Sequence, residues 1–578
     1  MTKKIISYLL VFILIVASTP ISLLEVKAEN TIGTNYYIDS ENGNDTNSGT
    51  SESSAWKTLD KVNSVVFEPG DNILFKSGGM WTGRLKPQGS GAEGAPIKID
   101  KYGGDVKPII NGSGSNILDG YNEGCTILLY NQEYWEIRNL EITNTSTSSN
   151  AACEGIWVIA KDFGTADHFV IEDCYIHNLT SNWRASTKLN VLDSGRFTDS
   201  QVGDNLGCGA ISFKAAAGGE LIPTRFNGIK ISGNTLCDTG FMTCGITVGS
   251  EWTNDQVAGF YELWAEPYYS TNILISNNYL YNTAAAITLC GVDGSVGDGV
   301  VIEHNVAHDN NESSSHWVFW HTFTKDVVWQ FNEVYDYDNG GTGDGGCFDT
   351  DGNTEGTIFQ YNYSRNIRAG VFTFCDVTWA PEKFNYHFVN DCVYRYNISQ
   401  NDNWGSRKNE GTFHGAGGHG YIYNNVIYVE GYNNCIIDFP IKEENEHYIY
   451  NNIFYYKNGS GSYVANKDAG KIFVENNCFY GVDMPTDVDT NYVVRNNLSV
   501  DPLFVDAGHG AEGFSSLDGY KLQANSPLIG MGKVIENNGG RDLWGNPVSP
   551  TLAPDIGAFQ TAYSTSSVRK PADNLTAT

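Results

Sequence analysis

The sequence predicts an all-β fold, a single-chain right-handed parallel β-helix with a capping segment at each end. Two observations predict this fold. A strand-like pattern that ends in Asn recurs along the chain, and each copy alternates apolar and polar residues with a period of two. The copies lie one solenoid coil apart, which is how repeat folds lengthen without enlarging a single core.

The repeat is clearest from residue 229 onward, and weaker copies end at Asn139 and Asp173. We interpret each Asn as a bend between two strands, because Asn tolerates left-handed backbone and its amide can join a ladder between coils. From Asn278 the intervals between successive copies run from 20 to 35 residues. The ten Asn residues are Asn234, Asn278, Asn305, Asn332, Asn362, Asn397, Asn425, Asn452, Asn477 and Asn497.

The first residues have the pattern of a signal peptide. Lys3 and Lys4 precede an apolar run over residues 5–17, and Ala28 offers a cleavage site before Glu29. We therefore expect a secreted protein, outside the cytoplasm and without a membrane anchor after cleavage. An uncleaved anchor is the alternative, because the apolar run is long.

The two ends of the chain differ from the repeat, as capping units of a solenoid do. The last stretch is rich in Ser and Thr, which is typical of a frayed terminus. The expected divisions are a signal peptide at 1–28, an N-terminal cap with the first coils at 29–110, the β-helix at 111–505, a C-terminal cap at 506–561 and a disordered tail at 562–578.

Composition limits the partners. The 67 acidic residues outnumber the 36 basic ones, and the net charge is -31. Because binding to a phosphate backbone depends on Lys and Arg, nucleic acid is excluded as the main partner. A polyanionic ligand is also disfavoured unless a bound cation reverses the local charge. We expect a monomer that binds carbohydrate.

The twelve Cys residues allow two interpretations of their chemical state. In an exported protein they could form disulfides, or they could be buried thiols stacked in the core. Several lie in strand-like segments, and no C-x-x-C pair is present to suggest a structural zinc site. The cysteines in strand-like segments are Cys174, Cys237, Cys290, Cys347, Cys392 and Cys478.

The glycine-rich segment 343–352 contains the candidate catalytic residues. Asp349 and Asp351 are two apart on a predicted strand, so both should point to the outer face, while Phe348 and Thr350 point inward. Two ionised carboxylates inside an apolar core would carry a large desolvation cost. Asp344 lies in the turn that leads into this strand, and we expect it to reach the same face.

Coil alignment adds candidate substrate-binding residues. The residues eleven positions before Asn332, Asn362 and Asn425 are His321, Asp351 and His414, so these three are expected along one face. A forward alignment of the next coil places Thr373 beside Asp349 and Cys375 beside Asp351. The expected substrate-binding set is His321, Trp320, Asp376, Trp379, His414 and Arg368.

The segments at both ends resemble those of secreted bacterial β-helix proteins, many of them polysaccharide lyases or glycoside hydrolases. The resemblance covers residues 36–79, the repeat and residues 519–557, and it implies a pectate-lyase-like solenoid. Residues 344–352, followed by residues 360–364, resemble a motif common in β-helix proteins of glycan-degrading bacteria, which does not single out one family. β-Helix glycosidases of the lacto-N-biosidase and β-xylosidase types are similar in using Asp or Glu pairs on adjacent coils. In the former type two catalytic Asp residues lie seven apart, and Asp344 and Asp351 have that spacing.

Three functions are compatible with the sequence. The first is an extracellular glycoside hydrolase that uses Asp351 with Asp344 or Asp349 and needs no cofactor. The second is a polysaccharide lyase, in which Asp349, Asp351 and Asp376 would hold Ca²⁺ near a uronate and a basic residue would remove the proton. The third is a non-catalytic glycan-binding solenoid.

Overall fold

The computed structural model describes most of the chain. The predicted signal peptide (residues 1–28) and the predicted tail (562–578) lie outside it. The described residues are 33–114, 124–147, 153–180, 209–240, 243–252, 268–309, 317–338, 345–375, 389–405, 411–414, 419–432, 434–439, 446–459, 461–465, 470–485 and 492–561.

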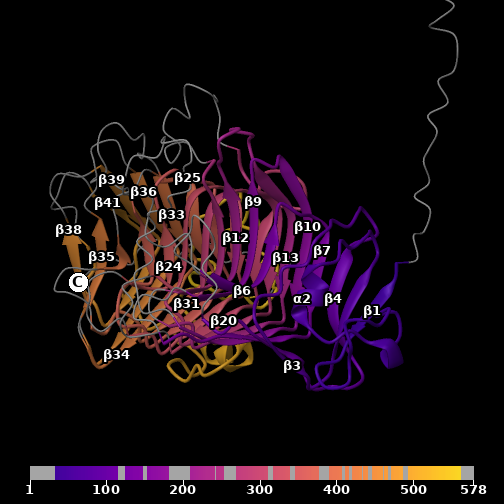
Figure 1. Ribbon diagram of the computed structural model, residues 1–578. Helices are drawn as coiled ribbons and strands as arrows, with labels where there is room; N and C mark the ends of the chain where they lie inside the picture. Colours follow the sequence, from indigo (N-terminus) through magenta and orange to yellow (C-terminus); the bar gives the residue numbers. More distant parts are fainter. Residues whose placement is uncertain are drawn as a thin grey trace, which may run out of the picture.

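The chain forms a right-handed parallel β-helix, as predicted (Figure 1). Each full coil contributes one strand to each of three sheets, which we name I, II and III. Along the chain a coil passes through sheet III, then sheet I and then sheet II, and each strand pairs in parallel with a strand of the next coil. The inward residues of all three sheets form one continuous apolar core. Helical structure in the described residues is limited to the short helix α2 (Leu59–Asn63) and the 3-10 turns η1 (Glu52–Ser54) and η2 (Phe514–Tyr520).

The strand bounds follow the repeat. Sheet I comprises β1 (Asn35–Ile38), β2 (Asn72–Lys76), β4 (Ile97–Tyr102), β7 (Trp135–Arg138), β10 (Thr165–Glu172), β13 (Arg225–Ser232), β16 (Thr271–Ser276), β19 (Val300–Glu303), β22 (Val327–Gln330), β26 (Ile358–Gln360), β30 (Cys392–Arg395), β33 (His419–Tyr423), β36 (Glu446–Tyr450), β39 (Lys471–Glu475) and β41 (Tyr492–Arg495). Sheet II comprises β3 (Met80–Thr82), β5 (Ile109–Asn111), β8 (Glu141–Asn144), β11 (Tyr175–Leu179), β14 (Thr235–Cys237), β17 (Tyr279–Tyr281), β20 (Val306–His308), β23 (Glu333–Tyr335), β27 (Tyr363–Arg365), β31 (Ile398–Gln400), β34 (Val426–Glu430), β37 (Ile453–Lys457) and β40 (Cys478–Tyr480). Sheet III comprises β6 (Gly124–Tyr130), β9 (Cys153–Lys161), β12 (Gly209–Ala216), β15 (Cys244–Ser250), β18 (Ile287–Asp293), β21 (Phe319–Lys325), β24 (Phe348–Thr350), β28 (Phe372–Phe374), β32 (Gly411–His414), β35 (Asn434–Phe439) and β38 (Gly461–Ala465). In the same sheet β25 (Thr354–Glu355) pairs with β21, and β29 (Val389–Asn390) pairs with β25.

The predicted Asn ladder is confirmed from Asn234 to Asn497. Each side-chain amide donates from Nδ2 to Oδ1 of the next ladder Asn at 2.9 to 3.1 Å. The same Oδ1 also accepts the preceding ladder residue's backbone N–H, as Asn332 accepts that of Asn305 at 3.1 Å. The ladder therefore satisfies buried polar groups at the corners between sheets I and II from Asn234 to Asn497.

The assignment of the left-handed residue was wrong by one position. The residue before the ladder Asn has the positive φ, for example Asn277 at 56°, His304 at 55° and Phe331 at 54°. Asn139 and Asp173, read as weak ladder copies, are such left-handed residues, with φ of 58° and 53°. The ladder Asn itself is selected for its amide, which the next coil requires, and the turn depends on its neighbour.

The C-terminal segment runs back along the solenoid, yellow in Figure 1. Gly513 donates to the carboxylate of Glu333 on β23, and Arg395 on β30 donates to the carbonyl oxygen of Asn537. Tyr520 is 1% exposed and donates to Oε1 of Gln400 at 2.6 Å. The segment thus contacts several successive coils of the β-helix.

In the described part of the chain, the structure favours buried thiols over disulfides. Cys174, Cys237, Cys347, Cys392 and Cys478 are buried and form no disulfide. Burial raises the pKa of the Cys174 thiol to about 12. These residues therefore pack as small apolar side chains.

Candidate functional site

The outer face of sheet III presents one row of residues from consecutive coils. Along the inner face Phe319, Phe348, Phe372 and Phe413 stack with ring centroids 5.3 to 5.7 Å apart. The residues that directly follow these Phe residues also pair with one another from coil to coil. Trp320 pairs with Asp349, Asp349 with Thr373, and Thr373 with His414.

Strand alternation places Asp349 opposite to the core, as predicted. Its neighbours Phe348 and Thr350 are inward, and Thr350 shares a hydrogen bond of 2.9 Å with the buried hydroxyl of Tyr394. Asp349 itself is only 4% exposed, so it lies at the bottom of the outer face. The predicted pairing of Asp349 with Thr373 is confirmed.

Asp351 follows β24 and is partly exposed. Its Oδ2 accepts a hydrogen bond from the indole Nε1 of Trp320 at 2.6 Å, and its backbone N–H donates to the carbonyl oxygen of His321 at 2.9 Å. Thr322 donates from Oγ1 to the carbonyl oxygen of Gly352 at 2.9 Å. Asp351 is thus held from the preceding coil through both its side chain and its backbone.

A bulge beside Asp351 shifts the register. His321 pairs with Thr350, whereas Thr324 pairs with Thr354, so the later strand has one more residue between the paired positions. The extra residue lies between Thr350 and Asn353, because the N–H groups of Phe323 and Thr324 donate to the carbonyl oxygens of Gly352 and Asn353. Bulges re-aim side chains and are frequent next to active sites.

The assignment of His321 to the substrate face was wrong. His321 is 0% exposed and stacks on Trp329 inside the solenoid, with its Nε2 3.1 Å from Oγ1 of Thr357. Burial lowers the pKa of His321 to about 3, so the ring is neutral. The count back from the ladder Asn crossed the bulge, and a shift of one residue moves a side chain to the opposite face.

The expected row of His321, Asp351 and His414 therefore does not form. The backbone of His414 pairs with Thr373 and lies in register with Asp349 instead. The remaining candidates Asp344, Asp376 and Trp379 lie outside the described residues.

Arg368 lies at the turn between sheets II and III. Its guanidinium donates to Oδ1 of Asp338 at 2.7 Å and lies over the ring of Trp404, 5.2 Å from the centroid. Gly405 follows at a close approach, where a Cβ would come within 2.6 Å of the Arg368 side chain. These contacts link three successive coils, and substrate binding by Arg368 stays a prediction.

An apolar wall adjoins Asp351; the sequence predicted Trp320 in it, but not the buried Cys290 and Phe323. Trp320 packs with Tyr269 against the buried residues Cys290 and Phe323. Lys325 lies over the ring of Tyr269, 5.6 Å from the centroid. Phe323 has a left-handed φ of 51°, which turns its ring to this side and interrupts the strand alternation. A partly exposed aromatic surface beside a carboxylate suits the apolar face of a sugar ring.

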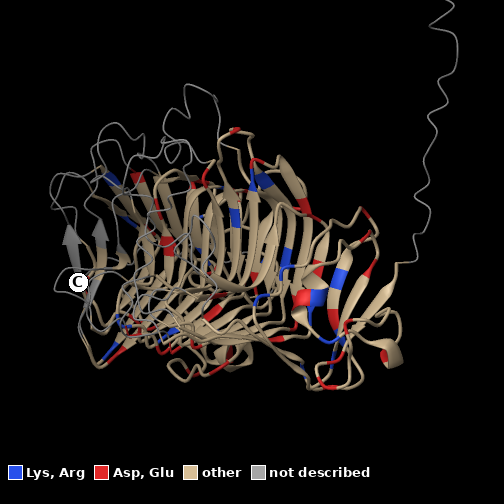
Figure 2. Cartoon of the chain, in the orientation of Figure 1, with Lys and Arg blue, Asp and Glu red and all other residues tan. Residues whose placement is uncertain are grey.

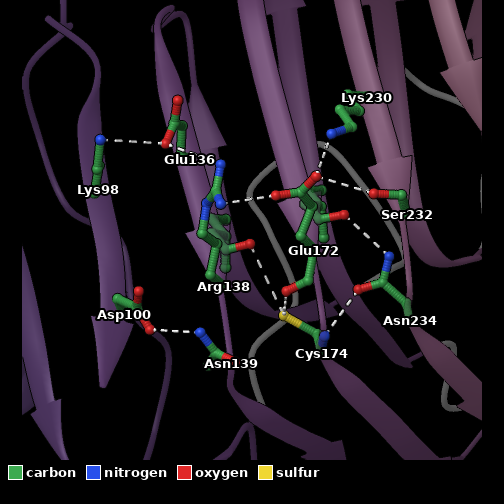
Figure 3. Close-up of polar contacts among 12 residues, drawn as sticks. Lys98, Asp100, Glu136, Arg138, Asn139, Glu172, Cys174, Lys230, Ser232 and Asn234 are labelled. Atoms are coloured by element: carbon green, nitrogen blue, oxygen red, sulfur yellow. Dashed lines mark hydrogen bonds and ion pairs between the residues drawn. The ribbon is translucent and has the colours of Figure 1, made fainter. Parts of the chain in front are cut away.

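A second cluster of charged residues lies on the outer face of sheet I (Figure 3). Glu172 accepts from Arg138 at 2.8 Å, from Lys230 at 2.6 Å and from Ser232 at 3.0 Å. Burial opposes ionisation of Glu172, but the hydrogen bonds from Lys230 and Ser232 outweigh it and lower its pKa. This network joins charges across coils and offers no protonated acid for catalysis.

Charge elsewhere follows the edges of the solenoid. Red and blue segments lie mainly at the turns, and most strand surface is uncharged (Figure 2). Among the described residues, no group of three or more His, Cys, Asp or Glu side chains is arranged to hold a metal ion. Within the same residues, no helix has the length and apolar character needed to span a membrane.

No family model matches the chain, and its similarity to known proteins lies at low identity. The chain is 27% identical over 643 residues to a lacto-N-biosidase of Bifidobacterium longum subsp. longum, which covers 93% of this chain and 37% of that protein. The chain therefore spans little more than a third of the length of this relative.

Solved structures of low identity are similar to the chain. A GH136 lacto-N-biosidase from Eubacterium ramulus is 21% identical, with a TM-score of 0.49, and the match covers 76% of this chain and 68% of that chain. A complex of XylC with xylose is 11% identical with a TM-score of 0.45, covering 91% and 98%. Pectate lyase Pel9A is 15% identical with a TM-score of 0.31, covering 92% and 97%.

Proposed function

We propose that this protein is a glycoside hydrolase that cleaves an oligosaccharide at the outer face of sheet III, with Asp351 as one of two catalytic carboxyl groups. The observation that carries the proposal is the partly exposed carboxylate of Asp351. It lies beside an aromatic wall, in a chain that is 27% identical to a lacto-N-biosidase over 93% of its length.

Glycoside hydrolysis needs two carboxyl groups with different protonation states. One donates a proton to the leaving oxygen, and the other acts as nucleophile or as base towards water. We propose Asp344 as the partner of Asp351, because the seven-residue spacing matches the resemblance to the lacto-N-biosidase type. Asp349 is the alternative partner, and its burial makes direct contact with a sugar less favourable.

The bond cleaved is proposed to be a lacto-N-bioside linkage, from the name of the relative. A neutral oligosaccharide also suits the net charge of -31 and the paired carboxylates of the outer face. The binding mode would place the apolar face of a sugar ring on Trp320 and Tyr269. Trp379, Asp376 and His414 stay proposed substrate contacts on the same side.

The lyase alternative is less well supported. A lyase would need a basic residue near the α-proton of a uronate, and Arg368 is engaged with the Asp338 carboxylate. The proposed hydrolase reaction needs neither Ca²⁺ nor another cofactor, because the two carboxyl groups supply the acid and the nucleophile or base. We further propose that the protein is exported after cleavage before Glu29 and acts as a monomer.

The test is an activity assay with matched variants. The mature protein is incubated with a chromogenic lacto-N-bioside, neutral oligosaccharides and uronans, each with and without EDTA. We expect chelator-resistant release of the disaccharide, and loss of at least about 10³-fold in kcat/KM in Asp351→Asn. Asp391→Asn, at an exposed left-handed position between β29 and β30, is the matched control and should keep full activity.

Two outcomes would overturn the proposal. An unsaturated product that absorbs in the ultraviolet, formed only from uronans, would show a lyase. Binding of glycans without turnover, unchanged in Asp351→Asn, would show a non-catalytic solenoid.

A further inference from the structure

We propose that Trp320 is a positioning residue, whose indole N–H holds Asp351 in its ionised form and in one orientation. This inference rests on the proposed function and assigns different roles to its two carboxyl groups. It also changes the expected role of Trp320, from a sugar-stacking platform alone to a hydrogen-bond donor within the site.

The geometry is that of a charge-assisted hydrogen bond. Nε1 of Trp320 lies 2.6 Å from Oδ2 of Asp351, just below the range of about 2.7–2.9 Å that is usual for charge-assisted N–H···O bonds. The ring is held in place because it packs against the buried Cys290 and Phe323, as Tyr269 also does. The backbone of Trp320 is fixed in turn by its pairing with Asp349.

The chemistry of the donor sets the protonation state. Indole nitrogen donates and never accepts, so it stabilises a carboxylate and offers nothing to the proton of a carboxylic acid. A hydrogen bond to the charged form of an acid favours that form. Asp351 is therefore the nucleophile or general base, and the proton for the leaving oxygen comes from the other carboxyl group.

Other charged groups face the same region and remain in place when the indole is removed. Among the described residues these include Asp349 on β24, whose ionised form opposes ionisation of Asp351, and Lys325 at the end of β21, whose charge favours it. Asp293 on β18 and Glu355 on β25 pair with Lys325 and offset its charge. Cys290 on β18 and Cys375 after β28 are the nearby thiols of the packed elements. A change in pH dependence on substitution of Trp320 then reports the lost hydrogen bond.

Two variants separate the hydrogen bond from the ring. Trp320→Phe keeps an aromatic ring and removes the N–H. Trp320→Gln removes the ring and places an amide N–H the same number of bonds from Cβ as the indole N–H. Trp329→Phe is the matched control, because Trp329 is 0% exposed and stacks in the core on Phe359.

The readout is the acid limb of the pH profile of kcat/KM on the chromogenic lacto-N-bioside. In Trp320→Phe we expect the limb to move up by about one pH unit and kcat to fall about 10- to 100-fold, from the usual strength of a hydrogen bond to a charged group. In Trp320→Gln the limb should stay within about 0.3 unit of wild type while KM rises. Trp329→Phe should keep the acid limb and the KM of the wild type, with a lower thermal midpoint of unfolding.

An unchanged acid limb in Trp320→Phe, with only KM raised, would overturn the proposal and leave Trp320 as a stacking platform. If Trp320→Phe is too slow to profile, the indole N–H resonance that this variant lacks is followed against pH in the wild-type protein. That resonance should move as Asp351 is protonated, and should not move in Asp351→Asn. Failure of the proposed function itself is distinct, since the wild-type protein would then hydrolyse no substrate.

Discussion

The indole Nε1 of Trp320 lies 2.6 Å from Oδ2 of Asp351, although the two residues are 31 positions apart and belong to successive coils. The contact forms because Trp320 points outward from β21 and Asp351 follows β24 at the bulge. It joins the aromatic wall to the partly exposed carboxylate. The candidate site is thus a product of coil stacking, which brings residues of one face together at every turn of the solenoid.

The three Asp residues of segment 344–351 should differ in effect when each is changed to Asn. We expect losses of at least about 10³-fold in kcat/KM for Asp351→Asn and Asp344→Asn, the size seen when an acid or base group is removed. Asp349→Asn should lose about tenfold, because this residue is 4% exposed and supports its neighbours rather than the sugar. Kinetics on the chromogenic lacto-N-bioside decide the ranking. A larger loss for Asp349→Asn than for Asp344→Asn would make Asp349 the catalytic partner.

The fold was predictable because every coil repeats the same physical requirement. A buried amide at each of these corners must bond to the coils above and below, so Asn recurs from 234 to 497 and the copies can be aligned from the sequence. The left-handed residue before it is less constrained, and Phe331, Tyr361 and Asn424 all fill that place. For this reason the sequence predicts the ladder correctly but places the left-handed bend one residue too late.

The candidate site was predictable only in part. Alternation on a short strand suffices to turn Asp349 outward, because the argument spans three residues. The register of His321 depends on the whole stretch to Asn332, and one extra residue between Thr350 and Thr354 in the next coil breaks the comparison. The contact between Trp320 and Asp351 depends on side-chain geometry across coils, which no spacing in the sequence encodes.

The Asn ladder should be most sensitive at its middle. Asn332 accepts two hydrogen bonds from Asn305 and donates to the carbonyl oxygen of Ile302 and to Asn362. Asn332→Ala leaves these buried groups without partners, so we expect a loss of about 3–5 kcal/mol in the free energy of unfolding. Asn497→Ala, at the partly exposed end of the ladder, should lose about 1 kcal/mol. Urea denaturation followed by circular dichroism measures both, and equal losses would contradict the cooperative ladder.

The C-terminal segment should depend on the packing of Tyr520. Its ring lies against Tyr428 and Phe504 with centroids 5.9 and 5.8 Å away, and its hydroxyl reaches Gln400. Tyr520→Ala should lower the free energy of unfolding by about 3–5 kcal/mol, and Tyr520→Phe by about 1 kcal/mol. Limited proteolysis should then release fragments from residues 498–561 in the Ala variant first. Equal protease resistance in both variants would show that the segment is held elsewhere.

The buried His321 should make the protein less stable in acid. Its pKa is about 3 in the folded state and 6.5 in the unfolded chain, so the unfolded chain binds the proton first as the pH falls below 6.5. Above pH 6.5 the ring is neutral in both states and has no such effect. At pH 5 the penalty is about 2 kcal/mol, and it grows towards pH 3.

His321→Phe removes this titration and keeps a ring that can stack on Trp329. The difference in unfolding free energy between the variant and the wild type should therefore shift by about 2 kcal/mol in favour of the variant between pH 7 and pH 5. Comparing the two pH values cancels the constant cost of fitting the larger ring. His509→Gln, at an exposed imidazole, is the control and should show little shift. Because His321 lies inside the solenoid, His321→Phe should also keep catalytic activity, and loss of activity without loss of folding would return this residue to the site.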